Sequence, residues 1–222
     1  MCGRFTLTLD PAEVKEQYEN ASFPEKFAAR FNIAPSQAIL AIPNDGKNAA
    51  DFFLWGLIPS WAKDAAMGAR MINARGETLA EKPSYRGAYK YKRCIIPADG
   101  FYEWKSQPGT KTKVPYFIHM KGGKPFAFAG LWDEWHAADG SPVRTCTIVT
   151  TAPNSLMATI HDRMPVILQP EDYAEWLDQA PRAPDSLQHL IASFPADQME
   201  AYPVSALVNS PANDRAECLQ PA

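Results

Sequence analysis

A cysteine stands directly after the initiator methionine, in the stretch MCGRF (1–5). If Met1 is removed, Cys2 carries a free α-amine and a thiol on adjacent carbons. Their reference pKa values are about 7.7–8.0 and about 8.5, so each group has a reactive fraction near neutral pH. The amine can attack an aldehyde to give a Schiff base, and the thiolate can then close a five-membered thiazolidine ring. The position of Cys2 therefore predicts a trap for aldehydes.

Six further stretches combine small, polar and aromatic residues more densely than a plain core does. Taken singly, each is ordinary, because a lone tryptophan, glutamate or proline-rich turn is common in any folded protein. A lone histidine is also more often structural than catalytic. In chain order the six are RFNIAPSQ (30–37), WGLIPSWAKD (55–64), MINARGET (71–78), RCIIPADGFYEW (93–104), AGLWDEW (129–135) and IHDRMPVIL (160–168).

Taken together and in this order, these stretches and MCGRF closely resemble the SRAP family, the SOS-response-associated peptidases. Members of that family crosslink to abasic sites in single-stranded DNA during the response to DNA damage. The resemblance is clearest from Cys2 to about Trp176, with a weaker echo in YPVSALVNSP (202–211). It implies that the protein removes its own Met1 and that Cys2 then forms a thiazolidine with the ring-opened abasic sugar. It also implies a possible lyase outcome, in which the Schiff base eliminates the 3′ phosphate.

By the same resemblance, four side chains form the reaction centre: Cys2, Asn73, Glu103 and His161. Glu103 in GFYEW corresponds to the acid–base group beside the Cys2 amine. His161 in IHDR corresponds to the acid that opens the sugar ring, and its reference pKa of about 6.5 suits that role. Asn73 in INARGET corresponds to an asparagine that hydrogen-bonds near the reacting atoms.

The resemblance also implies which side chains contact DNA. Arg4 and Arg75 correspond to arginines that grip phosphates, a role for which the guanidinium group is well shaped. Trp61 in PSWAKD corresponds to an aromatic side chain that stacks on a base and helps to separate strands at a junction. Thr150 and Thr151, at the end of TIVTT, are expected to donate hydrogen bonds to phosphate.

Charge is unevenly distributed along the chain of 222 residues, whose net charge is −3. Residues 60–94 contain eight lysines or arginines and three acids, whereas residues 168–222 contain nine acids and two arginines. This asymmetry suits a polyanionic partner on one face. Charge alone leaves a nucleic-acid surface and an ordinary solvated surface equally open.

The remaining composition argues against several classes of site. The four cysteines (Cys2, Cys94, Cys146 and Cys218) form no close pair, so neither a zinc site nor a disulfide framework is indicated. Cys94 and Cys146 are expected to be buried thiols. No apolar run approaches the roughly 20 residues of a membrane span, and no signal peptide precedes the motifs. We therefore expect a cytoplasmic monomer without metal or cofactor, and the resemblance adds association with the nucleoid.

Short apolar runs predict strands, because they are rich in β-branched and aromatic residues. A capped start at Asp10-Pro11 predicts a helix to about Asn20, and KGGK (121–124) predicts a hairpin turn. The alternation in 143–151 predicts a half-buried strand. Strands are expected at 38–42, 52–58, 93–97, 114–120, 125–132 and 143–151, and short helices at 154–160, 171–179 and 186–194.

This order of elements is typical of the α+β class. The resemblance adds a single domain, residues 1–222, in which mixed and antiparallel strands curl into a barrel-like sheet flanked by short helices. The segment 180–186 (APRAPDS) predicts a loop rather than a domain boundary. Residues 180–222 are expected to lie at the periphery of this domain.

Three other interpretations stay open at this stage. Cys2 could be the N-terminal nucleophile of an amidohydrolase, since one class of glutamine amidotransferases also begins Met-Cys-Gly. The aromatic-rich stretches could instead bind modified bases without any covalent chemistry. In the third interpretation MCGRF is simply a buried edge strand and Cys2 is a core thiol.

Overall fold

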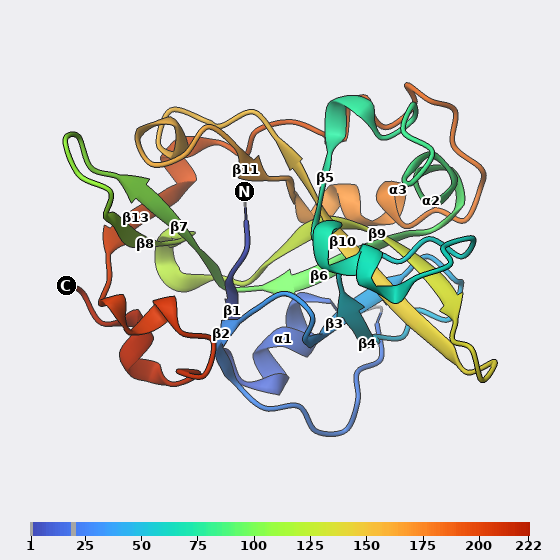
Figure 1. Cartoon of the computed structure of the whole chain (residues 1–222), viewed down its shortest axis with the longest axis horizontal. Helices are drawn as coiled ribbons and strands as arrows, with labels where there is room; N and C mark the ends of the chain where they lie inside the picture. The colour runs from blue at the N-terminus through green and yellow to red at the C-terminus, as the bar shows by residue number, and fades with distance from the viewer. Residues whose placement is uncertain (1, 19–20) are drawn as a thin grey trace.

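Five strands pair in a closed ring in the computed structural model, which describes residues 2–18 and 21–222. The strand order is β10-β4-β3-β6-β9, and β9 pairs back with β10 to close the barrel (Figure 1). Only the β10–β4 pair of the ring is parallel. The strands are β3 (Ala38–Pro43), β4 (Asp51–Trp55), β6 (Arg93–Ala98), β9 (Phe126–His136) and β10 (Pro142–Thr151).

The barrel strands form where the apolar runs predict them, but β10 is not half-buried as predicted. Every residue from Thr145 to Thr151 is buried. The hydroxyls of Thr145, Thr150 and Thr151 have partners inside the protein; Thr145 Oγ1, for example, accepts a hydrogen bond from Ile58 N at 2.9 Å. Because both faces of β10 are covered, alternating threonines here mark buried polar contacts and not a solvent face.

Three short strands extend the barrel, and two of them bring predicted site segments to β10. Strand β5 (Asn73–Arg75) pairs with β10 in parallel, placing Asn73 opposite Ile148. Strand β11 (Met164–Pro165) pairs with the end of β10, and β12 (Ile167–Leu168) pairs with β9. The segments that carry Asn73 and His161 therefore approach the same end of one barrel strand.

A second, five-stranded antiparallel sheet lies beside the barrel and includes the N-terminal strand. Strand β1 is an interior strand between β7 and β2, so the interpretation of MCGRF as an edge strand is wrong. The order is β13 (Met199–Pro203), β8 (Lys113–Met120), β7 (Gly100–Ser106), β1 (Phe5–Leu7) and β2 (Arg30–Ile33).

The KGGK segment (121–124) forms a turn, but not a hairpin turn. It joins β8 to β9, and these two strands belong to different sheets. Gly122 and Gly123 have φ values of 77° and 68°, in the left-handed region where glycine is favoured. The sequence predicts the turn correctly, but it does not show that β8 and β9 pair with strands of two different sheets.

Helices are few and short. Helix α1 (Pro11–Gln17) begins at the predicted cap, where Asp10 Oδ1 accepts a hydrogen bond from Ala12 N at 2.8 Å. It ends before the predicted limit, and Asn20 lies outside the described residues. The predicted helices at 154–160 and 186–194 are only 3₁₀ turns, at η4 (Met157–Thr159) and η6 (Gln188–Leu190).

The 171–179 prediction is partly confirmed by α3 (Tyr173–Trp176), whereas α2 (Arg86–Tyr91) was not predicted. Among the described helices, none is long and apolar enough to cross a lipid bilayer. The other 3₁₀ segments are η1 (Ala65–Arg70), η2 (Gly76–Thr78), η3 (Lys121–Gly123), η5 (Pro170–Asp172), η7 (Ala196–Gln198), η8 (Ala206–Asn209) and η9 (Ala216–Leu219).

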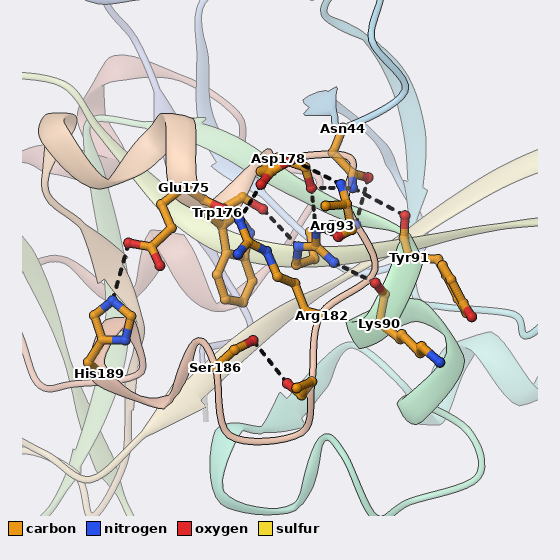
Figure 2. Close-up of polar contacts among 12 residues, drawn as sticks. Asn44, Lys90, Tyr91, Arg93, Glu175, Trp176, Asp178, Arg182, Ser186 and His189 are labelled. Atoms are coloured by element: carbon orange, nitrogen blue, oxygen red, sulfur yellow. Dashed lines mark hydrogen bonds and ion pairs between the residues drawn. The ribbon is translucent and has the colours of Figure 1, made fainter.

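One fully buried arginine, Arg93, fastens α2 and α3 to the barrel (Figure 2). Its guanidinium donates to the backbone oxygens of Tyr89 and Trp176, each at 2.8 Å, while its backbone N–H donates to Asn44 Oδ1 at 2.9 Å. Burial and the nearby positive charge of Arg182 lower the pKa of Arg93 to about 10. Backbone oxygens stabilise this charge, and no carboxylate in the described part of the chain pairs directly with it.

The segment after α3 has two parts. Residues 180–186 form a loop, as predicted, and Leu187, Phe194 and Met199 are then buried in the main core. Residues 204–222 instead pack on the outer face of the second sheet, where Val208 and Cys218 share a small cluster with Tyr102. In Figure 1 this red segment lies beside the blue strands β1 and β2.

Candidate active site

Cys2 lies at the N-terminal end of β1, next to the strand that carries Glu103. Strands β1 and β7 pair antiparallel, and Tyr102 N donates to Arg4 O at 3.0 Å, which continues the pairing toward the chain start. Asn73 Nδ2 donates to Cys2 O at 2.8 Å. Cys2 is fully buried. These backbone contacts fix its position more firmly than is usual near a chain end.

The surroundings of the Cys2 thiol favour its protonated form. Burial, together with the negative charge of Glu103, raises the pKa of this thiol well above its ordinary value. The thiolate fraction is therefore smaller than the one expected from the reference value, which assumes a solvated thiol. A nucleophilic step at sulfur needs a group that takes up the thiol proton.

His161 faces Glu103 from the segment after η4. Its Nε2 lies 3.9 Å from Glu103 Oε2, and its side chain is 22% exposed, so solvent or substrate can reach it. Arg163 N donates to Nδ1 at 3.1 Å, which places the hydrogen of the neutral ring on Nε2, toward Glu103. Asp162 Oδ1 lies 2.9 Å from Nδ1 and suits the charged ring instead. His161 thus has partners in both protonation states, as a proton-transfer group requires.

Asn73 presents an unused acceptor to this site. Its Oδ1 is buried and has no hydrogen-bond partner in the described part of the chain. Buried polar atoms are nearly always paired, so such an atom is a candidate contact for a bound molecule. Tyr85 Oη donates to the backbone oxygen of Asn73 at 3.2 Å, which helps to hold β5 in place.

The four predicted catalytic residues therefore lie together, although they are distant in sequence. Glu103 is 2% exposed and the Cys2 side chain is fully enclosed, whereas His161 opens toward solvent. The arrangement joins a cysteine, a buried carboxylate and a histidine. Chemically, such a site can transfer protons to and from a thiol.

The predicted DNA-contact residues are placed differently from one another. Arg75 is exposed at the end of β5, and Trp61 is 59% exposed. Thr150 and Thr151 are buried, and their hydroxyls donate to backbone oxygens of Ala74 and Ile191 at 3.4 and 3.2 Å. Hydroxyl contacts from the two threonines to phosphate would require these internal bonds to be exchanged.

Trp61 stands at the rim of a pocket of about 560 Å³. Tyr85 and Met67 also line this pocket, with Lys63 and Arg70 supplying positive charge. Because Tyr85 also bonds to Asn73, the pocket is connected directly to the strand of the candidate active site. A flat aromatic ligand next to a phosphate would suit these walls.

Two further residues tie the site together and were not singled out from the sequence. Arg163 donates to both carboxylate oxygens of Glu77, at 2.6 and 2.9 Å, and to Thr150 O at 2.8 Å. This pair connects the segment of His161 to the residues after Asn73. Both lie inside the motifs IHDR and NARGET, but their pairing across 86 residues has no signal in the sequence.

No group of three or more His, Cys, Asp or Glu residues in the described ranges is arranged to hold a metal ion. The four cysteines are free and buried, as expected for Cys94 and Cys146.

The closed barrel carries a site in which a buried cysteine lies close to a buried carboxylate and a partly exposed histidine. A sequence model of the family described as SOS response associated peptidase (SRAP) matches residues 1–211, and the chain belongs to this family.

Relatives and solved structures agree with this family. The chain is 53% identical to abasic site processing protein YoqW of Bacillus subtilis over 223 residues, covering 99% of each chain. It is 37% identical to abasic site processing protein HMCES of Gallus gallus over 191 residues, which cover 75% of this chain and 56% of that protein. A crystal structure from Bacteroides thetaiotaomicron matches with a TM-score of 0.89 at 27% identity over 100% of both chains. A protein from Bordetella bronchiseptica matches with a TM-score of 0.80 at 26% identity, over 92% of this chain and 100% of that one.

Proposed function

We propose that this protein recognises abasic sites in single-stranded DNA and captures the opened sugar covalently through Cys2. The observation that carries the proposal is the meeting of Cys2, Glu103, His161 and Asn73 at one end of the barrel. Relatives that are named abasic site processing proteins supply the substrate class.

The first proposed step frees the amine of Cys2. Hydrolysis of the Met1–Cys2 peptide bond consumes one water molecule and releases methionine, which leaves Cys2 with an α-amino group. Met1 itself lies outside the described residues. The buried carboxylate of Glu103 is the nearby base that can accept a proton from water or from the new ammonium group.

The second step opens the sugar and joins it to the amine. His161 donates a proton to the ring oxygen as the C1′–O4′ bond breaks, and the C1′ hydroxyl loses its proton to give the aldehyde. The Cys2 amine attacks this carbonyl, and the resulting carbinolamine loses water to form the imine. Glu103 accepts and returns the protons of the amine. Asn73 Oδ1 accepts a hydrogen bond from a sugar hydroxyl.

The third step closes the ring. The Cys2 thiol adds to the imine carbon, and its proton passes by way of Glu103 to the ring nitrogen, so that aldehyde and aminothiol give thiazolidine and one water overall. Because the thiol is held protonated by burial, closure depends on this transfer. If the imine persists, loss of the 3′ phosphate competes, which is the lyase outcome.

For binding, Arg4 and Arg75 hold phosphates and Trp61 stacks on a base near the junction of single and double strands. Thr150 and Thr151 contribute through the end of β10. We expect a monomer acting in the cytoplasm at the nucleoid. The pocket beside Trp61 gives the base a place next to the strand of Asn73.

Intact-mass spectrometry tests the function directly. Protein that begins at Cys2, incubated with single-stranded DNA carrying an abasic site, is expected to gain the mass of the DNA less one water. Cys2→Ala and Cys2→Ser should both lose the stable adduct, because each keeps the amine but lacks the thiol and can form only an imine that borohydride traps. Cys146→Ala, another buried cysteine, is the matched control and should keep the adduct. Glutamine hydrolysis without any adduct would favour the amidohydrolase, and reversible binding unaffected by Cys2→Ala would favour a base reader.

A further inference from the structure

Arg4 lies two residues from Cys2, and among the described residues it is held by neutral groups alone. Its Nη1 donates to Asn32 Oδ1 at 2.8 Å and to Val208 O at 2.6 Å, and its Nη2 donates to Asn209 O at 3.3 Å. The guanidinium carbon also lies 5.8 Å from the ring centre of Trp104. Each contact fixes the orientation of the guanidinium without cancelling its charge.

Most other arginines that are held by polar side-chain contacts in the described chain are paired with carboxylates. Those ion pairs leave little charge for a ligand, whereas Arg4, two residues from Cys2, keeps its positive charge. Burial lowers the pKa of Arg4, but a guanidinium remains charged at neutral pH. The pairs are Arg30 with Asp214, Arg144 with Asp45, Asp51 and Glu134, Arg163 with Glu77, Arg182 with Asp178, and Arg215 with Glu217.

Arg4 also has donors to spare. A guanidinium has five N–H groups, and three of those of Arg4 are used in the contacts above. Within residues 2–18 and 21–222, the Nε–H and one Nη2–H of Arg4 donate to no protein acceptor. A phosphate oxygen is the acceptor that best matches a charged, partly occupied guanidinium.

Asn32 is the residue that joins Arg4 to the C-terminal segment. It is fully buried on β2, and its amide nitrogen donates to Val208 O at 3.2 Å, Ser210 O at 3.0 Å and Asn213 O at 2.7 Å. Its amide oxygen faces Arg4. An aspartate would have the same shape, but its carboxylate would neutralise Arg4.

Asp214 fastens the same segment to β2 from the other side. It accepts hydrogen bonds from the backbone N–H groups of Phe31 and Asn32 at 2.6 and 3.0 Å, and it pairs with Arg30. We call residues 208–214 the C-terminal clasp. Because the clasp supplies two backbone acceptors for Arg4, the orientation of Arg4 depends on contacts more than 200 residues away in sequence.

We infer that Asn32 is a positioning residue which, with the C-terminal clasp, holds Arg4 as an un-neutralised cation for a DNA phosphate. The inference rests on the proposed function, since it takes the anion to be the phosphate beside the abasic sugar. Asn32 acts through Arg4 and does not touch DNA itself.

The test uses Asn32→Asp in the full-length chain and measures reversible binding of fluorescein-labelled single-stranded DNA. The DNA carries a tetrahydrofuran abasic analogue, which has no aldehyde and cannot crosslink. We expect affinity at low salt to fall about five- to tenfold, and the slope of log K against log salt to become shallower by about 0.7, as for one lost phosphate contact on a single strand. Thermal unfolding checks that the variant is folded.

Asn44→Asp is the matched control. Asn44 is also a buried asparagine that donates to backbone oxygens, those of Tyr91 and Asp178, but it lies at Arg93 and not at Arg4 (Figure 2). It therefore makes the same change of charge with a similar burial cost. Its salt slope should equal that of the wild type, and an equal loss of slope in both variants would overturn the inference.

A cycle with Arg4→Ala separates positioning from a general structural effect. In the Arg4→Ala background, adding Asn32→Asp should leave the salt slope unchanged, because the cation is already absent. If Asn32→Asp does not fold, Asn209→Asp replaces it. Asn209 is exposed, and its Oδ1 accepts a hydrogen bond from Trp104 Nε1 at 2.7 Å. An aspartate at this position can accept the same hydrogen bond while it places a negative charge near Arg4.

The outcomes separate the inference from the proposed function. A folded Asn32→Asp protein with wild-type affinity and slope would overturn the inference alone. Wild-type protein that binds the analogue but forms no adduct with a true abasic site would overturn only the proposed function. Wild-type protein that binds no single-stranded DNA would overturn both.

Discussion

His161 Nε2 lies 3.9 Å from Glu103 Oε2, slightly beyond hydrogen-bond distance, with the Cys2 thiol close enough to Glu103 for the carboxylate to raise its pKa. Two acid–base groups of different type thus face each other beside one nucleophile. One is buried and the other is partly exposed. This difference suits a division of labour, in which Glu103 serves the buried amine and thiol while His161 serves the sugar.

Replacing either acid–base group should slow adduct formation at a different step. Glu103→Gln keeps the shape of the side chain, His161→Gln replaces the imidazole by a neutral amide, and each should lower the adduct rate by about 10²-fold or more. Quenched time courses measure the rate. A substrate with a permanently open aldehyde should restore the rate of His161→Gln but not of Glu103→Gln, because only His161 is assigned to ring opening. Equal rescue of both variants would contradict the assignment.

The Glu77–Arg163 ion pair is expected to position His161. Glu77→Gln should reduce adduct rate severalfold and stability by only about 0.2–1 kcal/mol, since the pair is partly exposed. The hydrogen bond from Arg163 lowers the pKa of Glu77 in the folded protein. The ion pair therefore stabilises the fold fully at pH values above the ordinary carboxyl pKa. This stabilisation is lost as the pH falls through the lowered pKa of Glu77. Urea titrations at pH 7 and pH 3 measure this. Glu81→Gln, at an exposed glutamate of the same segment, should change neither quantity.

Trp61 is expected to contribute to binding and not to stability, because more than half of its surface is exposed. Trp61→Ala should weaken binding of the tetrahydrofuran DNA by about 5- to 100-fold, the range expected for loss of one stacked base. Its melting temperature should stay near that of the wild type. Phe52→Ala removes a comparably exposed aromatic side chain, 46% exposed and away from the pocket of Trp61, and should bind normally. If Trp61→Ala and Phe52→Ala weakened DNA binding equally, the result would contradict a stacking role for Trp61.

Buried thiols should make the fold sensitive to alkaline pH. Burial raises the pKa of Cys2, Cys94 and Cys146, so these thiols stay protonated in the folded chain while the unfolded chain ionises above about pH 8.5. Stability is therefore unaffected below that pH and falls as pH rises, by about 1.4 kcal/mol per pH unit for each thiol. Cys146→Ala should flatten the decline measured by urea unfolding between pH 8 and 10. An unchanged slope would contradict burial as the cause.

Local sequence was sufficient wherever neighbouring residues decide the structure. The Asp10-Pro11 cap, the β-branched runs of the barrel strands and the glycines at 122–123 are read correctly because caps, strand propensity and left-handed turns depend on a few adjacent residues. The motifs likewise identified Cys2, Glu103, His161 and Asn73, which the fold brings together. Helix predictions at 154–160 and 186–194 failed because packing against the core holds these segments in single 3₁₀ turns.

Only the tertiary structure decided the properties that depend on distant partners. The chain does not show locally that β8 and β9 enter different sheets, that burial keeps the Cys2 thiol protonated, or that neutral acceptors from β2 and the C-terminal clasp hold Arg4. Pairing, desolvation and charge balance arise from contacts between residues far apart in sequence. The chain therefore determined by itself which reactive groups are present, and folding determined their protonation, their orientation and the charge left for a ligand.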